Sequence, residues 1–144
     1  MEAAARNNMI VGTGHISALE GMALVRKAAE LKCRMVLTHT DNPADLYTIE
    51  QQKYAVELGA YVEHCFFTTY YNRVSIEEIA EQIRAVGCEY VILTTYFGHV
   101  KSPYSDEGML QYAQLLKAQG FTDDELFQMM SKNPENLLTT ATNI

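Results

Sequence analysis

Short apolar runs alternate with amphipathic stretches along most of the chain. Four runs rich in apolar and β-branched residues predict buried strands, at Met9–Gly14, Arg34–Thr38, Ala60–Phe67 and Tyr90–Thr95. Between them, apolar residues recur at helical spacing, and in the clearest stretch one face carries Ile76, Ile79, Ala80, Ile83 and Val86. The pattern predicts repeated strand–helix units.

Capping signals place the helix starts. A Ser or Thr followed three residues later by Glu or Gln satisfies free backbone donors at a helix start, and this occurs at Ser17–Glu20, Thr48–Gln51 and Ser75–Glu78. Further helices are expected at Asp106–Gln119 and from Thr122 through Met130. Residues 2–7 contain good helix formers and could be the last turn or two of a helix that runs into the first strand, or a remnant of a cut end. The tail Thr139–Ile144 is expected to be loose.

These elements predict an α/β fold in one domain, residues 1–144, built as (βα)4 with an extra C-terminal helix. Two architectures fit: an open flavodoxin-like sheet, or half of a TIM-type (β/α)8 barrel. Gly12-Thr-Gly14 is followed by His-Ile-Ser and not by the further glycine of a dinucleotide-binding loop, which favours the half-barrel. Four strands cannot close a barrel, so we expect two copies to associate as a homodimer.

The net charge and the cysteines limit the possible partners and the cellular compartment of the protein. With 11 basic and 18 acidic residues the net charge is −7, which argues against nucleic acid or an anionic membrane as a partner. The first residues lack the apolar segment of a signal peptide, and no stretch reaches the roughly 20 apolar residues of a membrane span. Cys33, Cys65 and Cys88 lack C-x-x-C spacing, so we expect reduced thiols in a cytoplasmic protein.

Histidines carry the candidate chemistry. The chain has four, His15, His39, His64 and His99, and each lies near or beyond the carboxyl end of a predicted strand. Carboxyl ends of parallel strands meet at one face, and neutral imidazole is the commonest metal ligand. We therefore expect His15, His39 and His64 to bind a divalent metal, with zinc favoured. The alternative is that they bond only to backbone or water.

Neighbouring polar residues give further expectations. Strand alternation places Glu63 on the side opposite His64, where we expect it to be solvated or in a salt bridge on the helix side. Asp41 and Asn42 are expected to form the turn after His39, with orientation of that ring as the alternative role. Tyr96 shares a face with Ile92 and Thr94 and could line an apolar ligand pocket, donate a hydrogen bond or bind metal as phenolate.

Several segments together resemble a known family. They are Thr13-Gly-His15, Leu37-Thr-His39, Glu63-His64, and the ending Gly120-Phe-Thr-Asp-Asp-Glu-Leu126 with Asn133-Pro-Glu-Asn-Leu-Leu138. From Met9 to Leu138 the chain is similar to the carboxyl-terminal half of the TIM-barrel metal-dependent hydrolases of the amidohydrolase superfamily.

This resemblance implies site roles. His39 and His64 match the metal ligands of the fifth and sixth barrel strands, and His15 ends the strand before them. Tyr96 stands where the family carries an aspartate that handles the proton, so Tyr96 or His99 would supply proton transfer. The chain also has no His-x-His pair, so the metal ligands of the first barrel strand are absent from it. The implied function is hydrolysis of an amide, ester or lactone of a small molecule. The alternative is a catalytically inactive natural fragment or engineered half-barrel scaffold that homodimerises.

Overall fold

Four parallel strands form one sheet. In the computed structural model, which describes residues 1–139, the strands are β1 (Ile10–Gly12), β2 (Arg34–Leu37), β3 (Tyr61–Cys65) and β4 (Val91–Thr94). Their order in the sheet is β1-β2-β3-β4, the order in which they occur along the chain. The predicted strands are therefore confirmed in number and direction, although each is shorter than the apolar run that predicted it.

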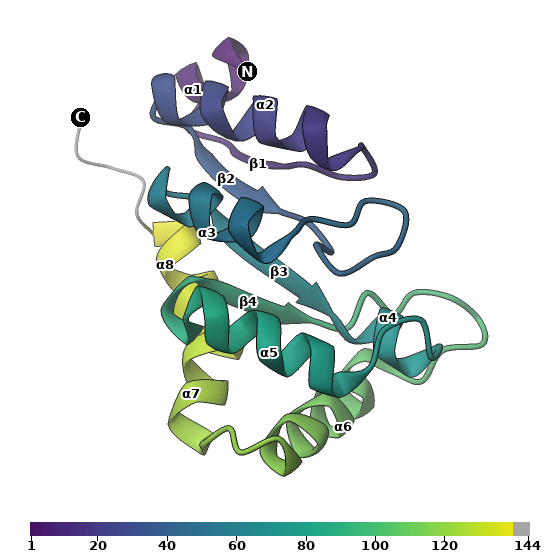
Figure 1. Ribbon diagram of the computed structural model, residues 1–144. Helices are drawn as coiled ribbons and strands as arrows, with labels where there is room; N and C mark the ends of the chain where they lie inside the picture. Colours follow the sequence, from purple (N-terminus) through teal and green to yellow (C-terminus); the bar gives the residue numbers. More distant parts are fainter. Residues whose placement is uncertain (140–144) are drawn as a thin grey trace.

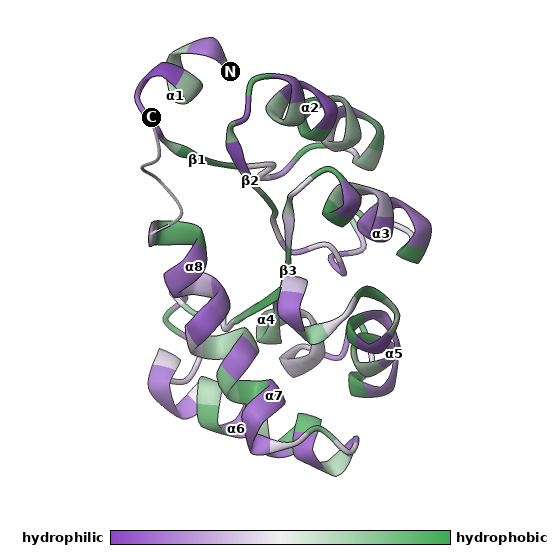
Figure 2. Cartoon of the chain, turned by 90° about the vertical axis from the view of Figure 1, so that its left-hand side faces the viewer, coloured by the Kyte–Doolittle hydropathy of each residue, from purple (hydrophilic) through white to green (hydrophobic). Residues whose placement is uncertain are grey.

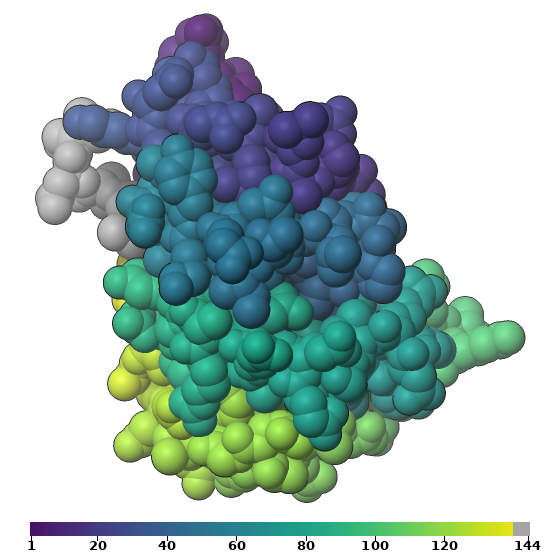
Figure 3. All heavy atoms as spheres, in the orientation of Figure 1, coloured from purple at the N-terminus to yellow at the C-terminus, as the bar shows by residue number. Residues whose placement is uncertain are grey.

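Helices follow the strands in sequence (Figure 1). The α-helices are α1 (Glu2–Arg6), α2 (Ala18–Glu30), α3 (Ile49–Glu57), α4 (Phe66–Tyr70), α5 (Ile76–Val86), α6 (Ser105–Ala118), α7 (Asp123–Phe127) and α8 (Asn133–Thr139). A 3₁₀ turn, η1 (Cys88–Tyr90), precedes β4, and a π-helical turn, η2 (Gln128–Lys132), joins α7 to α8. The units stack in chain order from one end of the molecule to the other (Figure 3).

The predicted helix starts are confirmed by their hydrogen bonds. Ser17, Thr48 and Ser75 are N-caps of α2, α3 and α5, and in each case the residue three positions later completes a capping box. The same arrangement begins α7 at Thr122. In α5 the predicted apolar face is also confirmed, because Ile79, Ala80, Ile83 and Val86 are buried in the main core.

Strand alternation divides the sheet into two faces. One face packs on α2, α3 and α5, which lie on the same side of the strands in Figure 2. It carries Met35 and Leu37 from β2, Val62 from β3, and Val91 and Leu93 from β4. On the opposite face, Val36 and Ile92 contact Leu137 of α8, and Arg34 donates to the Leu137 carbonyl at 2.6 Å. The two faces therefore have separate sets of side chains.

The topology is compatible with half of an α/β barrel. A flavodoxin-like sheet has a point at which the strand order reverses, whereas here sequential strands are neighbours throughout. Within residues 1–139, β1 and β4 each pair on one side only. The strand order therefore favours the half-barrel over the flavodoxin-like alternative.

Two local predictions were wrong. The third strand ends at Cys65, and Phe66–Tyr70 forms helix α4. The Phe66 ring stacks on Tyr112 with centroids 4.9 Å apart, so tertiary packing overrides the strand preference of this aromatic run. The helix predicted through Met130 continues through the π-helical turn into α8. Thr139 ends α8, and the rest of the tail predicted to be loose lies outside the described residues.

Cys33, Cys65 and Cys88 are all free thiols, as predicted. Among residues 1–139, no helix has both the length and the apolar character needed to cross a membrane.

Candidate metal centre

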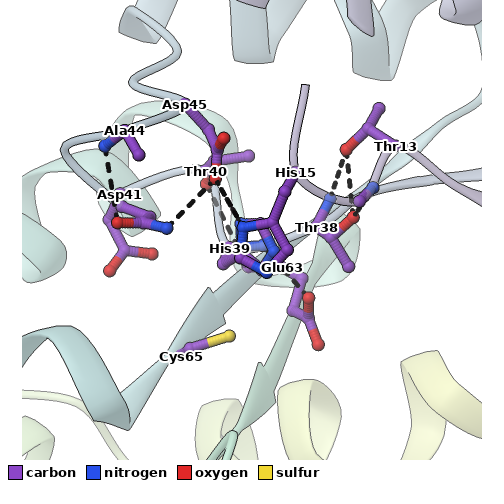
Figure 4. Close-up of polar contacts among 12 residues, drawn as sticks. Thr13, His15, Thr38, His39, Thr40, Asp41, Ala44, Asp45, Glu63 and Cys65 are labelled. Atoms are coloured by element: carbon purple, nitrogen blue, oxygen red, sulfur yellow. Dashed lines mark hydrogen bonds and ion pairs between the residues drawn. The ribbon is translucent and has the colours of Figure 1, made fainter. Parts of the chain in front are cut away.

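Two histidines and an aspartate meet at the carboxyl end of the sheet. His15 follows β1, His39 follows β2, and Asp45 belongs to the loop that leads from β2 to α3. Figure 4 shows the two imidazole rings close together with Asp45 beside them. One ligand atom from each of the three residues lies within 4.8 Å of the other two.

His39 and Asp45 form the buried part of this group. His39 Nδ1 is 2.8 Å from Asp45 Oδ2, and both side chains are almost fully buried. Despite this short contact, the buried nitrogen has no hydrogen bond of acceptable geometry within residues 1–139. Asn42 donates from Nδ2 to the same Asp45 oxygen at 3.1 Å and holds the carboxylate in place. A buried ring nitrogen without an aligned partner suits a ligand outside the chain.

His15 forms the exposed part of the group. Its ring centroid is 4.4 Å from that of His39, and its Nδ1 is 3.8 Å from Asp45 Oδ2. Its other nitrogen, Nε2, is 2.8 Å from the Tyr96 hydroxyl. Metal-binding histidines usually contact a polar group through their second nitrogen, which fixes the orientation of the ring. His15 has that arrangement with Asp45 on one side and Tyr96 on the other.

The donor set can hold a metal ion. Two imidazole nitrogens and one carboxylate oxygen are ligands that zinc and ferrous iron both accept. The three residues come from two separate loops, and three ligands leave coordination positions open for water or substrate. His15, His39 and Asp45 could therefore bind a divalent cation.

The backbone at this edge adopts conformations that non-glycine residues rarely take. His39 has φ of 38° and Tyr96 has φ of 55°, and Gly14 directly before His15 has φ of 62°. A left-handed backbone on an L-residue is unfavourable unless the surroundings impose it, and such residues cluster at functional sites. Here these conformations turn the chain at the strand ends, so His39 and Tyr96 depart from strand alternation.

Tyr96 and His99 take different positions. Tyr96 is close to the metal-capable group, with its ring centroid 5.5 Å from that of His39. His99 is exposed on the loop after β4, and its ring is 5.8 Å from that of Phe67. Among the candidate catalytic residues, the structure brings Tyr96 to the group and places His99 on the wall of the adjoining pocket.

His64 lies away from the group. It is still within β3, has no exposed surface, and contacts Asp41 Oδ1 through Nδ1 at 3.2 Å. The Thr68 hydroxyl donates to the other Asp41 oxygen. His64 shares strand parity with Val62, which packs on the helix side, so the expected set of His15, His39 and His64 is not brought together.

Glu63 faces the side opposite His64, but the setting expected for it was wrong. Its carboxylate accepts hydrogen bonds from the His39 backbone N–H at 3.1 Å and from the Thr94 hydroxyl at 3.0 Å. Within residues 1–139 Glu63 forms no salt bridge, and it does not face the helix side. Glu63 instead holds the backbone of His39 in its left-handed conformation, directly below the metal-capable group.

Cys65 lines the same pocket as His15 and His39 but is not part of the metal-capable group. Burial, followed by the nearby Glu63 carboxylate, raises the pKa of its thiol well above the ordinary value. Metals bind cysteine as thiolate. The metal-capable group does not include Cys65, whose Sγ lies 3.2 Å from the Thr94 hydroxyl, so the ligand set remains two histidines and an aspartate.

A pocket of about 280 Å³ adjoins the group. His15, His39 and Tyr96 are part of its wall, together with Phe67 and Arg73 from the segment after β3. A larger hollow of about 510 Å³ lies in the loop between residues 97 and 107, but of the four histidines it contains only His99. The smaller pocket is the better site for chemistry because it contacts the metal-capable residues.

Asp45 is the site residue that sequence reasoning missed. The sequence pointed to Asp41 and Asn42, which follow His39 directly, whereas the carboxylate that reaches His39 lies six residues after it. The signal was the second acidic residue in one polar turn, Asp41-Asn-Pro-Ala-Asp45. Its position depends on the turn, in which Asp45 N–H donates to the Asn42 carbonyl at 2.9 Å.

Comparison with known proteins adds one match. The model of a family of unknown function, DUF6282, matches residues 1–63. His15, His39 and Asp45 all lie inside this matched segment, whereas His64, Arg73 and Tyr96 lie outside it. No curated protein matches the chain.

Proposed function

We propose that this chain is a metal-dependent hydrolase of the amidohydrolase type. A divalent metal, zinc in the first instance, is held by His15, His39 and Asp45. The observation that carries the proposal is the convergence of these three side chains, from two separate loops, with ligand atoms within 4.8 Å. Their place at the carboxyl end of a parallel sheet is the position of active sites in α/β barrels.

The metal would supply a Lewis acid that activates water near neutral pH and polarises a carbonyl. The residues around it then have separate tasks. Asp45, fixed by Asn42, holds the buried ring of His39. Tyr96 orients His15 through its hydroxyl. Proton transfer to the leaving group belongs to Tyr96 or His99, since both line the pocket.

The substrate in this proposal is a small amide, ester or lactone. The pocket of about 280 Å³ lies just below the usual range for small-molecule sites, which fits a small substrate. Free cysteines fit a reducing compartment such as the cytoplasm.

We further propose that two copies associate to complete the barrel. What supports this is the sequential strand order together with the edges of β1 and β4, which are unpaired within residues 1–139. An inactive half-barrel scaffold that homodimerises is the alternative. It would share this assembly but bind no metal.

Native mass spectrometry of zinc-loaded protein tests metal and assembly together. We expect one zinc per chain and twice the 16.2 kDa mass of a single chain. His39→Gln should lose the zinc, whereas the matched variant His99→Gln should keep it, because His99 lies outside the ligand group.

Different results would contradict different parts of the proposal. Less than about 0.2 zinc per chain, with ferrous iron also failing to load, would rule out the metal-dependent hydrolase and leave the scaffold. A single-chain mass at micromolar concentration would rule out the completed barrel. If the protein binds ferrous iron more tightly than zinc, the metal is iron and not zinc.

A further inference from the structure

We propose that Arg73 makes the pocket beside the metal-capable group a carboxylate-binding site, so that the substrate is a small carbonyl compound bearing a carboxylate. The identity of the reacting carbonyl rests on the function proposed above. The carboxylate site itself rests on the charge and geometry of the pocket wall.

The pocket wall differs in charge from the rest of the chain. The net charge of the protein is −7, yet none of the nine residues that line this pocket is Asp or Glu. Arg73 is the one permanently charged residue among them. The nearby Asp41 and Asp45 are buried behind the wall and are engaged with His64 and His39. An anion entering the pocket therefore meets a cation and no exposed carboxylate.

Arg73 is held in position but keeps its donors free. Its backbone N–H donates to the Thr68 carbonyl at 2.8 Å, and its guanidinium carbon lies 5.0 Å from the centroid of the Phe67 ring. Within residues 1–139 the guanidinium has no salt bridge and no hydrogen bond. By contrast, Arg84 is paired with Glu125. Stacking on an aromatic ring leaves the planar edge of a guanidinium available for two parallel hydrogen bonds.

Phe67 connects the two parts of the pocket. Its ring is 5.7 Å from Tyr96 and 5.8 Å from His99, measured between centroids, and Arg73 lies over the same ring. A ligand resting against Phe67 can thus reach Arg73 at one end and the region of Tyr96 and His15 at the other. One guanidinium balances the single charge of one carboxylate and can make two parallel hydrogen bonds to it.

Paired probes test this assignment. N-acetylglycine and N-acetylglycinamide differ only in the carboxylate, and we would titrate each into ¹⁵N-labelled protein, first free of metal and then loaded with zinc. The metal-free titration separates binding at Arg73 from ligation of a metal by the carboxylate. We expect N-acetylglycine to bind about tenfold more tightly and to shift the amide signals of Phe67 and Arg73.

Variants locate the effect. Arg73→Gln should reduce the affinity for N-acetylglycine about tenfold and leave N-acetylglycinamide unchanged, while Arg73→Lys should restore part of the loss because it keeps the charge. Arg26→Gln is the matched control, since Arg26 is exposed on α2. Arg73 is itself exposed, so these substitutions should not disturb folding.

Equal binding of the two probes, no binding of either, or an undiminished affinity in Arg73→Gln would overturn the carboxylate site. Failure of the hydrolase proposal gives a different result. If zinc does not bind but the metal-free protein still prefers N-acetylglycine through Arg73, the carboxylate site stands and the metal-dependent function does not.

Discussion

Two histidine–aspartate pairs lie at neighbouring strand ends and take both aspartates from the same turn. His39 is 2.8 Å from Asp45, and His64 is 3.2 Å from Asp41. The first pair reaches the pocket through His39 and stands next to His15. The second pair has no exposed surface and is tied to Thr68. Similar residue types thus give a site for a ligand in one place and a structural contact in the other.

The difference arises from where each histidine leaves its strand. β2 ends at Leu37, and His39 lies beyond it with φ of 38°, which turns its ring toward the pocket. β3 runs to Cys65, so His64 is still in register with Leu93 and points to the helix side. In this chain, the histidine beyond the last paired residue turns toward the pocket through its left-handed backbone, whereas the histidine still within its strand keeps the strand alternation.

Replacing each aspartate by asparagine should separate the two pairs most strongly. Asp41→Asn removes the buried carboxylate that faces His64 and Thr68, and we expect the free energy of unfolding to fall by about 3 kcal/mol. Asp45→Asn should lower it by about 1 kcal/mol or less, because Asn42 can still donate to the amide oxygen. Urea unfolding of metal-free protein measures both.

The same two substitutions should affect zinc affinity in the opposite order, with Asp45→Asn having the larger effect. Asp45→Asn removes a ligand and should weaken binding, whereas Asp41→Asn should leave the affinity of the folded protein unchanged. Equal losses of stability in the two variants would mean that Asp45 is a second structural group. The contrast between the pairs would then be lost.

The sequence predicted the regular parts of this architecture. Capping boxes at Ser17, Thr48 and Ser75 and the apolar face of α5 were sufficient because they depend on contacts within one helix. His15 and His39 were also predicted as neighbours, since the carboxyl ends of adjacent parallel strands converge. These features follow from local spacing and from strand direction.

Features that depend on exact strand ends or on distant contacts could not be predicted. Both faces of a covered parallel sheet are apolar, so hydrophobicity did not show which face His64 takes. The helix at Phe66–Tyr70 requires Tyr112, more than forty residues further along the chain. Asp45 reaches His39 only through the hydrogen bonds of its turn. In each case the deciding partner is set by the folded structure.

The Nε2 atoms of His15 and His64 differ in their contacts, and this difference predicts a smaller effect on zinc affinity. His15 Nε2 contacts the Tyr96 hydroxyl at 2.8 Å, whereas His64 Nε2 is buried without a hydrogen-bond partner within residues 1–139. Tyr96→Phe should weaken zinc binding about tenfold by releasing the His15 ring. Tyr104→Phe, at an exposed tyrosine in the same loop, should leave affinity unchanged. We would measure both by competition with a chromophoric chelator, and equal affinities would show that Tyr96 does not orient the ligand.

An exposed ion pair should show the smallest effect and sets a scale for the buried pairs. Hydrogen bonding to Arg84, followed by that to the Thr122 backbone, lowers the pKa of Glu125 from 4.5 to about 2. The stability from this lowered pKa is fully present above pH about 4.5 and is lost as the pH falls through about 2. Both side chains are partly exposed, so water and salt should limit it to less than about 1 kcal/mol. Arg84→Gln should therefore lose less stability than the parent protein between pH 5 and pH 3 in urea unfolding, with Arg26→Gln behaving like the parent. If Arg84→Gln loses as much free energy of unfolding between these pH values as the parent, the ion pair does not shift the Glu125 titration. If the two proteins differ by as much as Asp41→Asn is expected to lose, the distinction between exposed and buried carboxylates is removed.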